Sequence, residues 1–296
     1  MARRPDQHTV VVGVDGSAEG TEALRYAVGA AQARGMWLFV VHAYDLPPHG
    51  PMEAAALAAA AAASAYRVTA DALSQVTVPA ELEVETAVEL TTPLRLLERL
   101  SADAALIVLG QHTIDPAASS SAQPLSSAVA AGSSCPLIIV PPGWSRRRAL
   151  SRSIVVGLDD QTSVRVVLGF AFREADRRGW SVVALQALSG AAVPAQQSAR
   201  SADIDAVIAE QRQEHPTVPV TVAVTLNSLA QIVLDDSRRA RLVVVGRPHG
   251  LTAQAGAWST ATVEPALADA YCPLALVPDD AWLDDAESAP GRPEPR

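Results

Sequence analysis

Short apolar runs that end at a glycine recur along the chain. Residues 105–110 read Ala-Leu-Ile-Val-Leu-Gly, and residues 242–246 read Leu-Val-Val-Val-Gly. A run that is apolar at every position predicts a strand buried on both faces, as in a parallel sheet. A glycine at its end lets a ligand or a loop approach the backbone closely. Because ligands of open α/β sheets bind at the carboxyl ends of strands, we expect any small-molecule site at Gly110 and Gly246.

Amphipathic stretches separate the apolar runs, and their order predicts strands that alternate with helices. In the first half we expect strands at about 9–14, 37–43, 82–88, 105–110 and 137–140, and helices at about 18–34, 52–76, 93–100 and 123–131. In the second half we expect strands at about 153–158, 180–186, 220–224, 242–245 and 274–277, and helices at about 162–177, 199–215, 229–238 and 258–270. Such alternation indicates βαβ units with a parallel sheet, the α/β fold class. The polar alternation of 82–88 is typical of a strand near a sheet edge.

Local signals mark the ends of some helices. Ser17 or Asp15 is placed to cap the first helix, and Gly35 is placed to end it. Thr91 or Thr92 is placed to cap the third helix, which starts with a proline.

The chain contains an internal duplication. Residues 10–15 recur at 154–159, an offset of 144; Gly110 recurs as Gly246, an offset of 136; and Cys135-Pro136 recurs as Cys272-Pro273, an offset of 137. Copies of this length are domains and not solenoid repeats. We therefore predict domains at 8–144 and 152–282, joined by a linker at 144–152 that carries the basic run 146–148. Residues 283–296, rich in Pro, Glu and Arg, are expected to be a disordered tail.

Composition and charge exclude several classes of function. The 23 basic residues are all arginines, so P-loop, Schiff-base and kinase-type lysine chemistry is excluded. The net charge of −9 is poorly suited to nucleic acid, whose phosphates need cationic partners. No run is long and apolar enough to span a membrane, and the segment before Asp15 has no apolar core of a secretory signal. Two cysteines make no disulfide framework, so we expect a cytoplasmic protein without membrane or nucleic-acid partners.

A carboxylate follows the first strand in each copy, at Asp15 and Asp159. At the carboxyl end of a strand, such a group accepts hydrogen bonds from a ribose hydroxyl or an adenine amino group. The alternative role for Asp15 is a cap of the following helix. We expect surface or packing roles for the six histidines. None has a Cys, Asp or Glu at metal-ligand spacing, and no Gly-x-Ser-x-Gly motif occurs. We therefore expect no metal site and no catalytic residues.

Four segments of the first copy, taken in their order and spacing, resemble the universal stress protein family. They are Val-Val-Gly-Val-Asp-Gly-Ser at 11–17, Phe-Val-Val-His-Ala at 39–43, Ile-Val-Leu-Gly at 107–110 and Ser-Cys-Pro-Leu-Ile-Ile-Val at 134–140. The resemblance extends to the second copy and indicates a tandem member. It implies five-stranded, Rossmann-like parallel sheets flanked by helices. It also implies an ATP site with the motif Gly-x2-Gly-x9-Gly-Ser/Thr, which runs from the fourth strand into the last helix.

By this resemblance, the nucleotide-binding positions of the first copy can be named, but the motif is eroded. The second motif glycine is replaced by Thr113, and the Gly-Ser pair is replaced by Gln123-Pro124, of which Pro124 has no backbone N–H to donate to phosphate. Ser126 and Ser127, two and three residues after Pro124, offer hydroxyl groups that can take the place of the lost N–H donor. The positions carried over are Gly13, Val14, Asp15, Ala43, Gly110, Gln111, Thr113, Ser126 and Ser127.

The second copy is eroded further. Gln186 replaces the strand histidine, and one extra residue separates the two motif glycines. Arg247 or His249 is a candidate to offer charge to phosphate. The positions carried over are Asp159, Ala187, Gly246, Gly250, Ser259 and Thr260.

Three functions remain open at this point. The resemblance favours a stress-response sensor or adaptor that binds ATP or AMP, with Mg²⁺ only as a companion of the nucleotide. The eroded motifs leave open an adaptor that acts through unknown protein partners without nucleotide. An ATP hydrolase ranks last, because no residue stands out as a water-activating base. The family also pairs through its last strands, so 137–140 and 274–277 are expected to form an intramolecular pseudo-dimer, with a homodimer as a further possibility.

Overall fold

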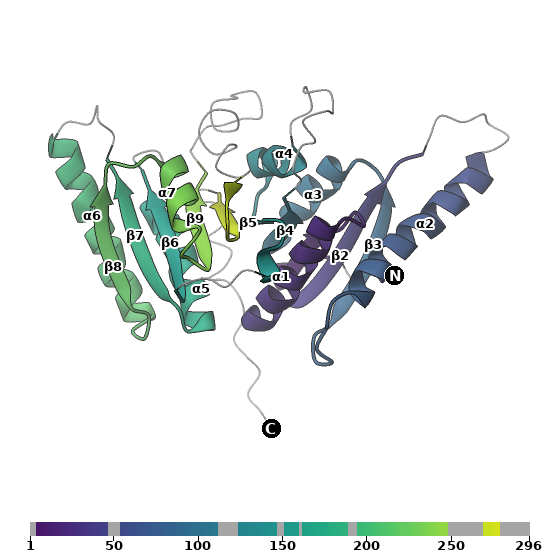
Figure 1. Cartoon of the computed structure of the whole chain (residues 1–296), viewed down its shortest axis with the longest axis horizontal. Helices are drawn as coiled ribbons and strands as arrows, with labels where there is room; N and C mark the ends of the chain where they lie inside the picture. Colours follow the sequence, from purple (N-terminus) through teal and green to yellow (C-terminus); the bar gives the residue numbers. More distant parts are fainter. Residues whose placement is uncertain are drawn as a thin grey trace.

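In the computed structural model the chain forms one ten-stranded sheet (Figure 1). The structure describes residues 4–46, 54–111, 124–146, 151–159, 162–188, 194–247 and 269–278. The first half contributes β1 (Thr9–Gly13), α1 (Ala18–Arg34), β2 (Trp37–Tyr44), α2 (Ala54–Ser74), β3 (Val84–Leu90), α3 (Pro93–Ser101), β4 (Leu106–Gly110), α4 (Leu125–Gly132), β5 (Leu137–Val140) and a 3₁₀ turn, η1 (Trp144–Arg146). The second half contributes β6 (Ser153–Leu158), α5 (Val164–Arg178), β7 (Ser181–Ala187), α6 (Pro194–Glu214), β8 (Val220–Thr225), α7 (Leu229–Asp236), β9 (Leu242–Gly246) and β10 (Leu274–Val277).

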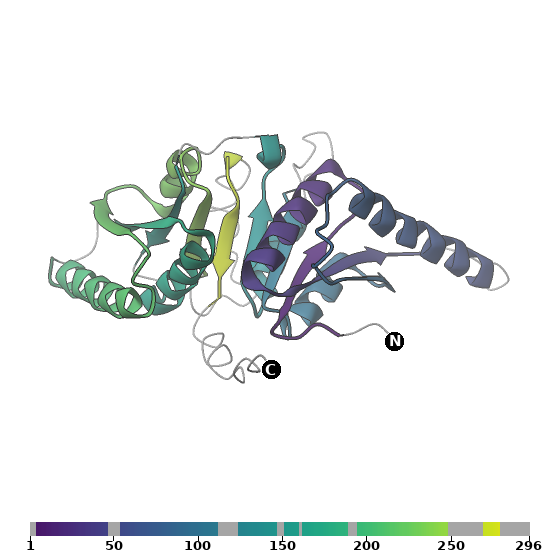
Figure 2. The same ribbon diagram turned by 90° about the horizontal axis from the view of Figure 1, so that it is seen from below.

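The two halves meet at their last strands. The strand order is β3-β2-β1-β4-β5-β10-β9-β6-β7-β8, so β3 and β8 are the edges. All neighbours within a half are parallel. The central pair, β5 with β10, is antiparallel, with Ile138 opposite Ala275, and Figure 2 shows β10 in yellow beside β5. The α/β class, the edge position of β3 and the pairing of the last strands within one chain are confirmed.

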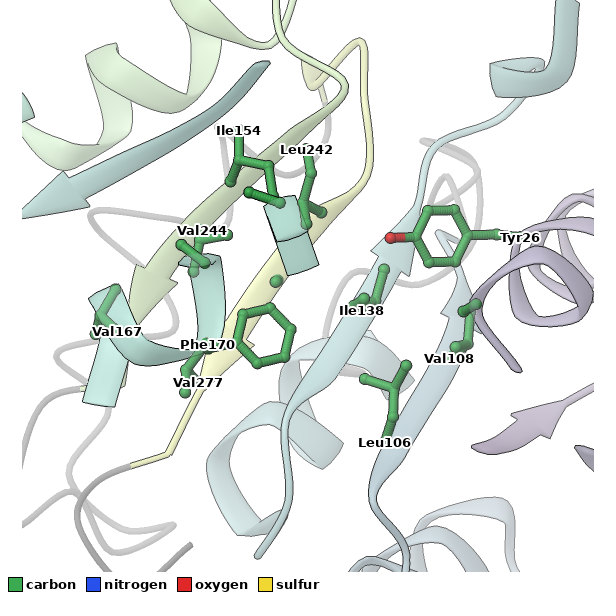
Figure 3. Close-up of a cluster of buried hydrophobic side chains, with 14 of the residues drawn as sticks. Tyr26, Leu106, Val108, Ile138, Ile154, Val167, Phe170, Leu242, Val244 and Val277 are labelled. Carbon is green, nitrogen blue, oxygen red and sulfur yellow. The ribbon is translucent and has the colours of Figure 1, made fainter. Parts of the chain in front are cut away.

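Helices cover both faces of the sheet, and one core runs across the two halves. Helices α1, α2, α5 and α6 lie on one face with strand residues such as Val10, Ile138 and Val244. Helices α3, α4 and α7 lie on the other face. Near the centre, Tyr26 of α1 lies beside Ile138, and Phe170 of α5 lies beside Val277 (Figure 3). Because strand residues of both halves belong to one buried cluster, the halves form a continuous core.

Most predicted elements are present with shifted ends. The strand predicted at 82–88 is β3, and the helix predicted from 199 starts earlier, at Pro194, because proline is well tolerated in a first helical turn. The helix predicted from 123 starts at Leu125 with Pro124 as its N-cap. The helix predicted at 258–270 lies, but for its last two residues, outside the described residues, as do the predicted tail and residues 147–150 of the predicted linker. The domain boundaries stay a prediction.

The start of the predicted linker is anchored on α1. The Trp144 ring packs edge-on against the Tyr26 ring, with centroids 5.3 Å apart. The backbone N–H and the hydroxyl of Ser145 both donate to the Glu22 carboxylate at 2.8 Å. The start of the predicted linker is therefore packed against the first half.

Candidate functional site

A cavity of about 170 Å³ lies in the first half, at the carboxyl ends of β1, β2 and β4. Its walls come from six segments in all: Gly13 of β1 with Val14 and Asp15 after it; Glu19 and Gly20 of α1; Val41, His42 and Ala43 of β2; Pro93, Leu96 and Leu97 of α3; Leu109 and Gly110 of β4; and Leu125 and Ser126 of α4. Six predicted positions therefore border one cavity: Gly13, Val14, Asp15, Ala43, Gly110 and Ser126. The site lies where open α/β sheets place their ligands.

Asp15 sits at the rim of the cavity and supports the start of α1. One carboxylate oxygen accepts hydrogen bonds from the backbone N–H of Ser17 at 3.0 Å and from its hydroxyl at 2.5 Å. Ser17 itself is the N-cap of α1, since its hydroxyl oxygen accepts from the Gly20 N–H at 3.0 Å. Of the two predicted caps, Ser17 is thus the one used. Asp15 holds that cap in place and is exposed at the cavity.

His42 is a cavity residue that the sequence interpretation assigned to surface or packing. Its Nδ1 lies 2.7 Å from the carbonyl oxygen of Val14. Because a carbonyl only accepts, Nδ1 carries the proton in this contact, and the neutral ring keeps Nε2 as an acceptor. The bond joins the end of β2 to the turn after β1. The place of His42 directly before Ala43, at the end of a buried strand, was the signal available in the sequence.

Residue 110 lies so close to the backbone of α1 that a side chain at this position would collide with the helix. A Cβ placed on Gly110 would lie 2.5 Å from both the carbonyl carbon and the carbonyl oxygen of Glu19. In the second half, a Cβ on Gly246 would lie 2.7 Å from the Cβ of Thr162 and 2.8 Å from a methyl of Val167. Within the described residues, the close neighbour of Gly110 is α1, and the close neighbours of Gly246 are α5 and the residue before its N-cap. That these glycines also admit a ligand stays a prediction.

The remaining predicted positions of the first half divide into three cases. Gln111 is buried and donates its N–H to the Val140 carbonyl at 2.9 Å, so it extends the pairing of β4 with β5 and does not line the cavity. Ser127 is buried in α4, one residue beyond the cavity lining. Thr113 lies outside the described residues. Ser126 is therefore the hydroxyl that α4 presents to the cavity.

In the second half, α6 is tied onto the corresponding strand ends. An Nη of Arg200 donates to the carbonyl oxygens of Asp159 and Thr162, the latter at 2.7 Å. The hydroxyl of Ser201 donates to the Gln186 side chain at 2.9 Å. Asp159 accepts from the Thr162 hydroxyl at 3.1 Å. Arg200 therefore lies against the turn after β6, which corresponds to the turn after β1 at the rim of the first-half cavity.

Comparisons with known proteins agree with this geometry. The model of the Universal stress protein family matches residues 7–141. Universal stress protein Rv2005c of Mycobacterium tuberculosis is 27% identical over 266 residues, which cover 84% of this chain and 90% of that protein. The first half of the chain is by the family match a universal stress protein domain. The second half repeats the strand order of the first, so the chain carries two domains of the same fold in tandem.

Solved universal stress proteins share this fold. The crystal structure of one from Archaeoglobus fulgidus superposes with a TM-score of 0.65 at 14% identity, over 93% of this chain and 98% of that one. A universal stress protein in complex with cAMP matches 46% of this chain and 97% of that one, with 25% identity and a TM-score of 0.34.

Other second-domain positions of the universal stress protein motif do not form a phosphate site in the described part. Ala187 pairs with Thr225 at the end of β7. Gly250, Ser259, Thr260 and His249 lie outside the described residues. Arg247, a candidate phosphate ligand in the sequence, directs one Nη to three backbone carbonyls of the first domain. Its guanidinium therefore binds the chain itself, because helix carbonyls attract a cation.

The charge around the first-domain cavity is negative. The residues that line it include the acidic Asp15 and Glu19 and no arginine, and the sequence of residues 112–123, between β4 and α4, contains no arginine either. Among the described residues, no three His, Cys, Asp or Glu side chains gather to hold a metal ion. No described helix has the length and apolar character to cross a membrane. The cavity thus offers apolar walls, the acidic residues Asp15 and Glu19, the His42 ring and the Ser126 hydroxyl.

Proposed function

We propose that the first domain binds an adenine nucleoside or nucleotide reversibly in this cavity, and that the protein acts as a ligand-dependent sensor or adaptor in the stress response and not as an enzyme. One observation carries the proposal: Asp15, Ala43, Gly110 and Ser126, which the family resemblance assigns to the nucleotide, border one cavity. The cavity has the usual character of a small-molecule site, apolar with a few convergent polar groups.

The character of the walls supports a flat heteroaromatic ligand. Leu96, Leu97 and Leu109 give the cavity apolar sides suited to a base. Asp15, exposed at the rim, is an acceptor for ribose hydroxyl groups. Leu125 and Ser126 of the first turn of α4 line the same cavity, and a helix N-terminus with a hydroxyl beside it suits a single phosphate.

The negative lining favours a ligand with few phosphates. A phosphate charge about 8 Å from a carboxylate is repelled by about 2 kcal/mol at an effective dielectric constant of about 20. Asp15 and Glu19 both contribute, and Pro124 removes one N–H donor from the start of α4. We therefore propose the affinity order adenosine or AMP above ATP, with Mg²⁺ reducing the difference by screening the triphosphate.

The arrangement in the second domain supports one site per chain. Arg200 and Ser201 of α6 bind the strand ends there, at the place that corresponds to the first-domain cavity. Cys135 is buried and free, which supports our proposal of a reducing, cytoplasmic setting.

The test is calorimetric titration of the full chain with adenosine, AMP and ATP, the last with and without Mg²⁺. We expect one ligand per chain, with ATP bound more weakly than AMP. Asp15→Asn keeps an acceptor for Ser17 but removes the charge, and we expect about tenfold weaker binding of adenosine, which has no phosphate for the charge to repel. Asp159→Asn is the matched control, because it makes the same change at the corresponding position of the second domain.

Two outcomes separate the alternatives. No binding of any of these ligands at millimolar concentration overturns the proposal and favours the adaptor that acts without nucleotide. Phosphate release from ATP that is lost in Asp15→Asn but kept in Asp159→Asn would instead establish a hydrolase.

A further inference from the structure

Helix α4 forms one wall of the first-domain cavity but is weakly anchored by its own sequence. It has eight residues, and its N-cap, Pro124, makes no side-chain capping bond. Its first turn has no acidic residue and its last turn no basic residue, so neither end complements the helix dipole. Helices this short are marginal on their own. The position of Leu125 and Ser126 at the cavity therefore depends on contacts that α4 makes elsewhere.

The second domain supplies such a contact at the far end of α4. Arg247 directly follows β9, and its Nη1 lies 3.1 Å from the carbonyl oxygen of Ala130, 3.5 Å from that of Ala131 and 2.6 Å from that of Ser133. The carbonyls of a last helical turn have no partner within the helix. A cation at that end also interacts favourably with the dipole. Arg247 thus caps α4 from the other domain.

The backbone of Arg247 is fixed by its place in the sheet. Its backbone N–H donates to the Val277 carbonyl at 2.7 Å, which extends the pairing of β9 with β10. Since β10 pairs with β5, the strand that follows α4, the guanidinium reaches α4 from a strand of the same continuous sheet. The contact therefore connects two parts of the chain whose relative position is already fixed.

Only one of the two copies has a charged residue at the position of Arg247. The residue after the corresponding strand of the first domain is Gln111, whose N–H donates to Val140 as that of Arg247 donates to Val277. The backbone role is thus shared by both copies. The cation is present only in the second domain, where it points to the helix that lines the first-domain cavity.

We propose that Arg247 is a positioning residue for the ligand site of the first domain: by holding the carboxyl end of α4 it fixes the α4 wall of the cavity, so ligand affinity in one domain depends on a side chain of the other. The part that concerns affinity rests on the proposed function. The part that concerns α4 does not.

The test compares Arg247→Gln, which installs the residue of the first copy, with wild type by hydrogen–deuterium exchange of the ligand-free full chain. We expect the α4 amides from Ala128 to Ser133 to exchange at least about tenfold faster, and those of β4 to stay unchanged. Calorimetry with adenosine and AMP is expected to show about five- to tenfold weaker binding.

Two control variants separate positioning from a general loss of stability. Arg34→Gln removes a different contact between the domains, the ion pair with Glu174. Arg238→Gln removes a second-domain arginine that stacks on the Tyr271 ring, 4.4 Å from its centroid. The contacts described for these two side chains lie in α1, in α5 and at the Tyr271 ring, away from α4. Both variants are therefore expected to keep wild-type exchange in α4 and wild-type ligand affinity well below their unfolding temperatures.

The outcomes distinguish failure of this inference from failure of the proposed function. Unchanged exchange of α4 in Arg247→Gln overturns the inference, whatever the ligand does. Faster exchange with unchanged affinity overturns the link to the ligand site. If wild type binds no adenine ligand, the proposed function and the affinity part fall together, and the exchange of α4 still decides whether Arg247 positions that helix.

Discussion

The guanidinium of Arg34 lies 2.8 Å from the carboxylate of Glu174, in an ion pair that joins α1 of one domain to α5 of the other. Both side chains are buried, Glu174 completely. Arg178, which occupies in the second copy the position of Arg34 in the first, also binds Glu174, at 3.4 Å. The position of Glu174 is taken in the first copy by Ala30. One carboxylate thus serves the two corresponding arginines, an asymmetry that a dimer of identical chains cannot have.

Glu174→Gln tests the importance of this carboxylate. The change leaves Arg34, Arg177 and Arg178 close together without their anion. Since removing one partner of a buried ion pair costs about 3–5 kcal/mol, we expect the free energy of unfolding at pH 7 to fall by about 3 kcal/mol in urea titrations. Glu210→Gln is the control, because the Glu210–Arg165 pair is exposed, and we expect a loss under about 1 kcal/mol. Equal losses in the two variants would contradict the assignment.

The same group predicts how stability depends on pH. Burial raises the pKa of Glu174, but the charges of Arg34, Arg178 and Arg177 outweigh this effect, so the pKa is lowered in the folded protein. A carboxyl with a lowered pKa stabilises the fold above its unfolded pKa of about 4.3, and this contribution is lost as the pH falls further. The stability difference between wild type and Glu174→Gln is therefore expected to be constant from pH 7 to about 5.5 and to shrink below about pH 4. A difference that grows on acidification would refute this prediction.

The fold could be predicted from the sequence because its signals are local. Apolar runs such as Leu242–Gly246 are long enough to identify buried strands, and the pairing of β5 with β10 followed from the family resemblance. The ends of helices were less certain, as at Leu125, because proline and capping residues allow several starts.

The site could be predicted only in part. Its first-domain positions follow the strand ends, and Asp15, Ala43 and Gly110 do meet at one cavity. The contacts of Arg247 with Ala130 and of Arg200 with Asp159 span 117 and 41 residues. Long, flexible arginine side chains reach whichever carbonyls the fold brings near, and no sequence period encodes that choice. The sequence therefore indicated a phosphate partner for Arg247, where the structure has a helix end.

Cys135 is predicted to be chemically inert in the folded protein. Burial raises the pKa of its thiol to about 12, although a hydrogen bond with Ser133 opposes the shift. At pH 8 the thiolate, which is the reactive form, is then about one part in ten thousand. We expect no alkylation of Cys135 by iodoacetamide in the native protein at pH 8 over an hour, and complete alkylation in denaturant, as measured by mass spectrometry. Rapid alkylation of the native protein would instead support redox sensing at this residue.

Gly110→Ala is predicted to destabilise the fold even without ligand. The added methyl would lie 2.5 Å from the Glu19 backbone, and backbone atoms cannot move aside as a flexible side chain can. We expect a loss of about 1–3 kcal/mol in the free energy of unfolding, the usual cost of overpacking. The substitution is for this reason a poor probe of ligand binding.

Gly29→Ala is the matched comparison for Gly110→Ala. Gly29 lies within α1, and a Cβ added there meets no atom within 4 Å. Since alanine favours the helix over glycine by about 0.5–1 kcal/mol, we expect this variant to be more stable than wild type. Urea titrations of the two ligand-free variants should therefore shift in opposite directions. If Gly110→Ala is as stable as wild type, the first turn of α1 can move away from β4 to make room for the added methyl. Close approach of the ligand would then be the remaining reason for a glycine at residue 110.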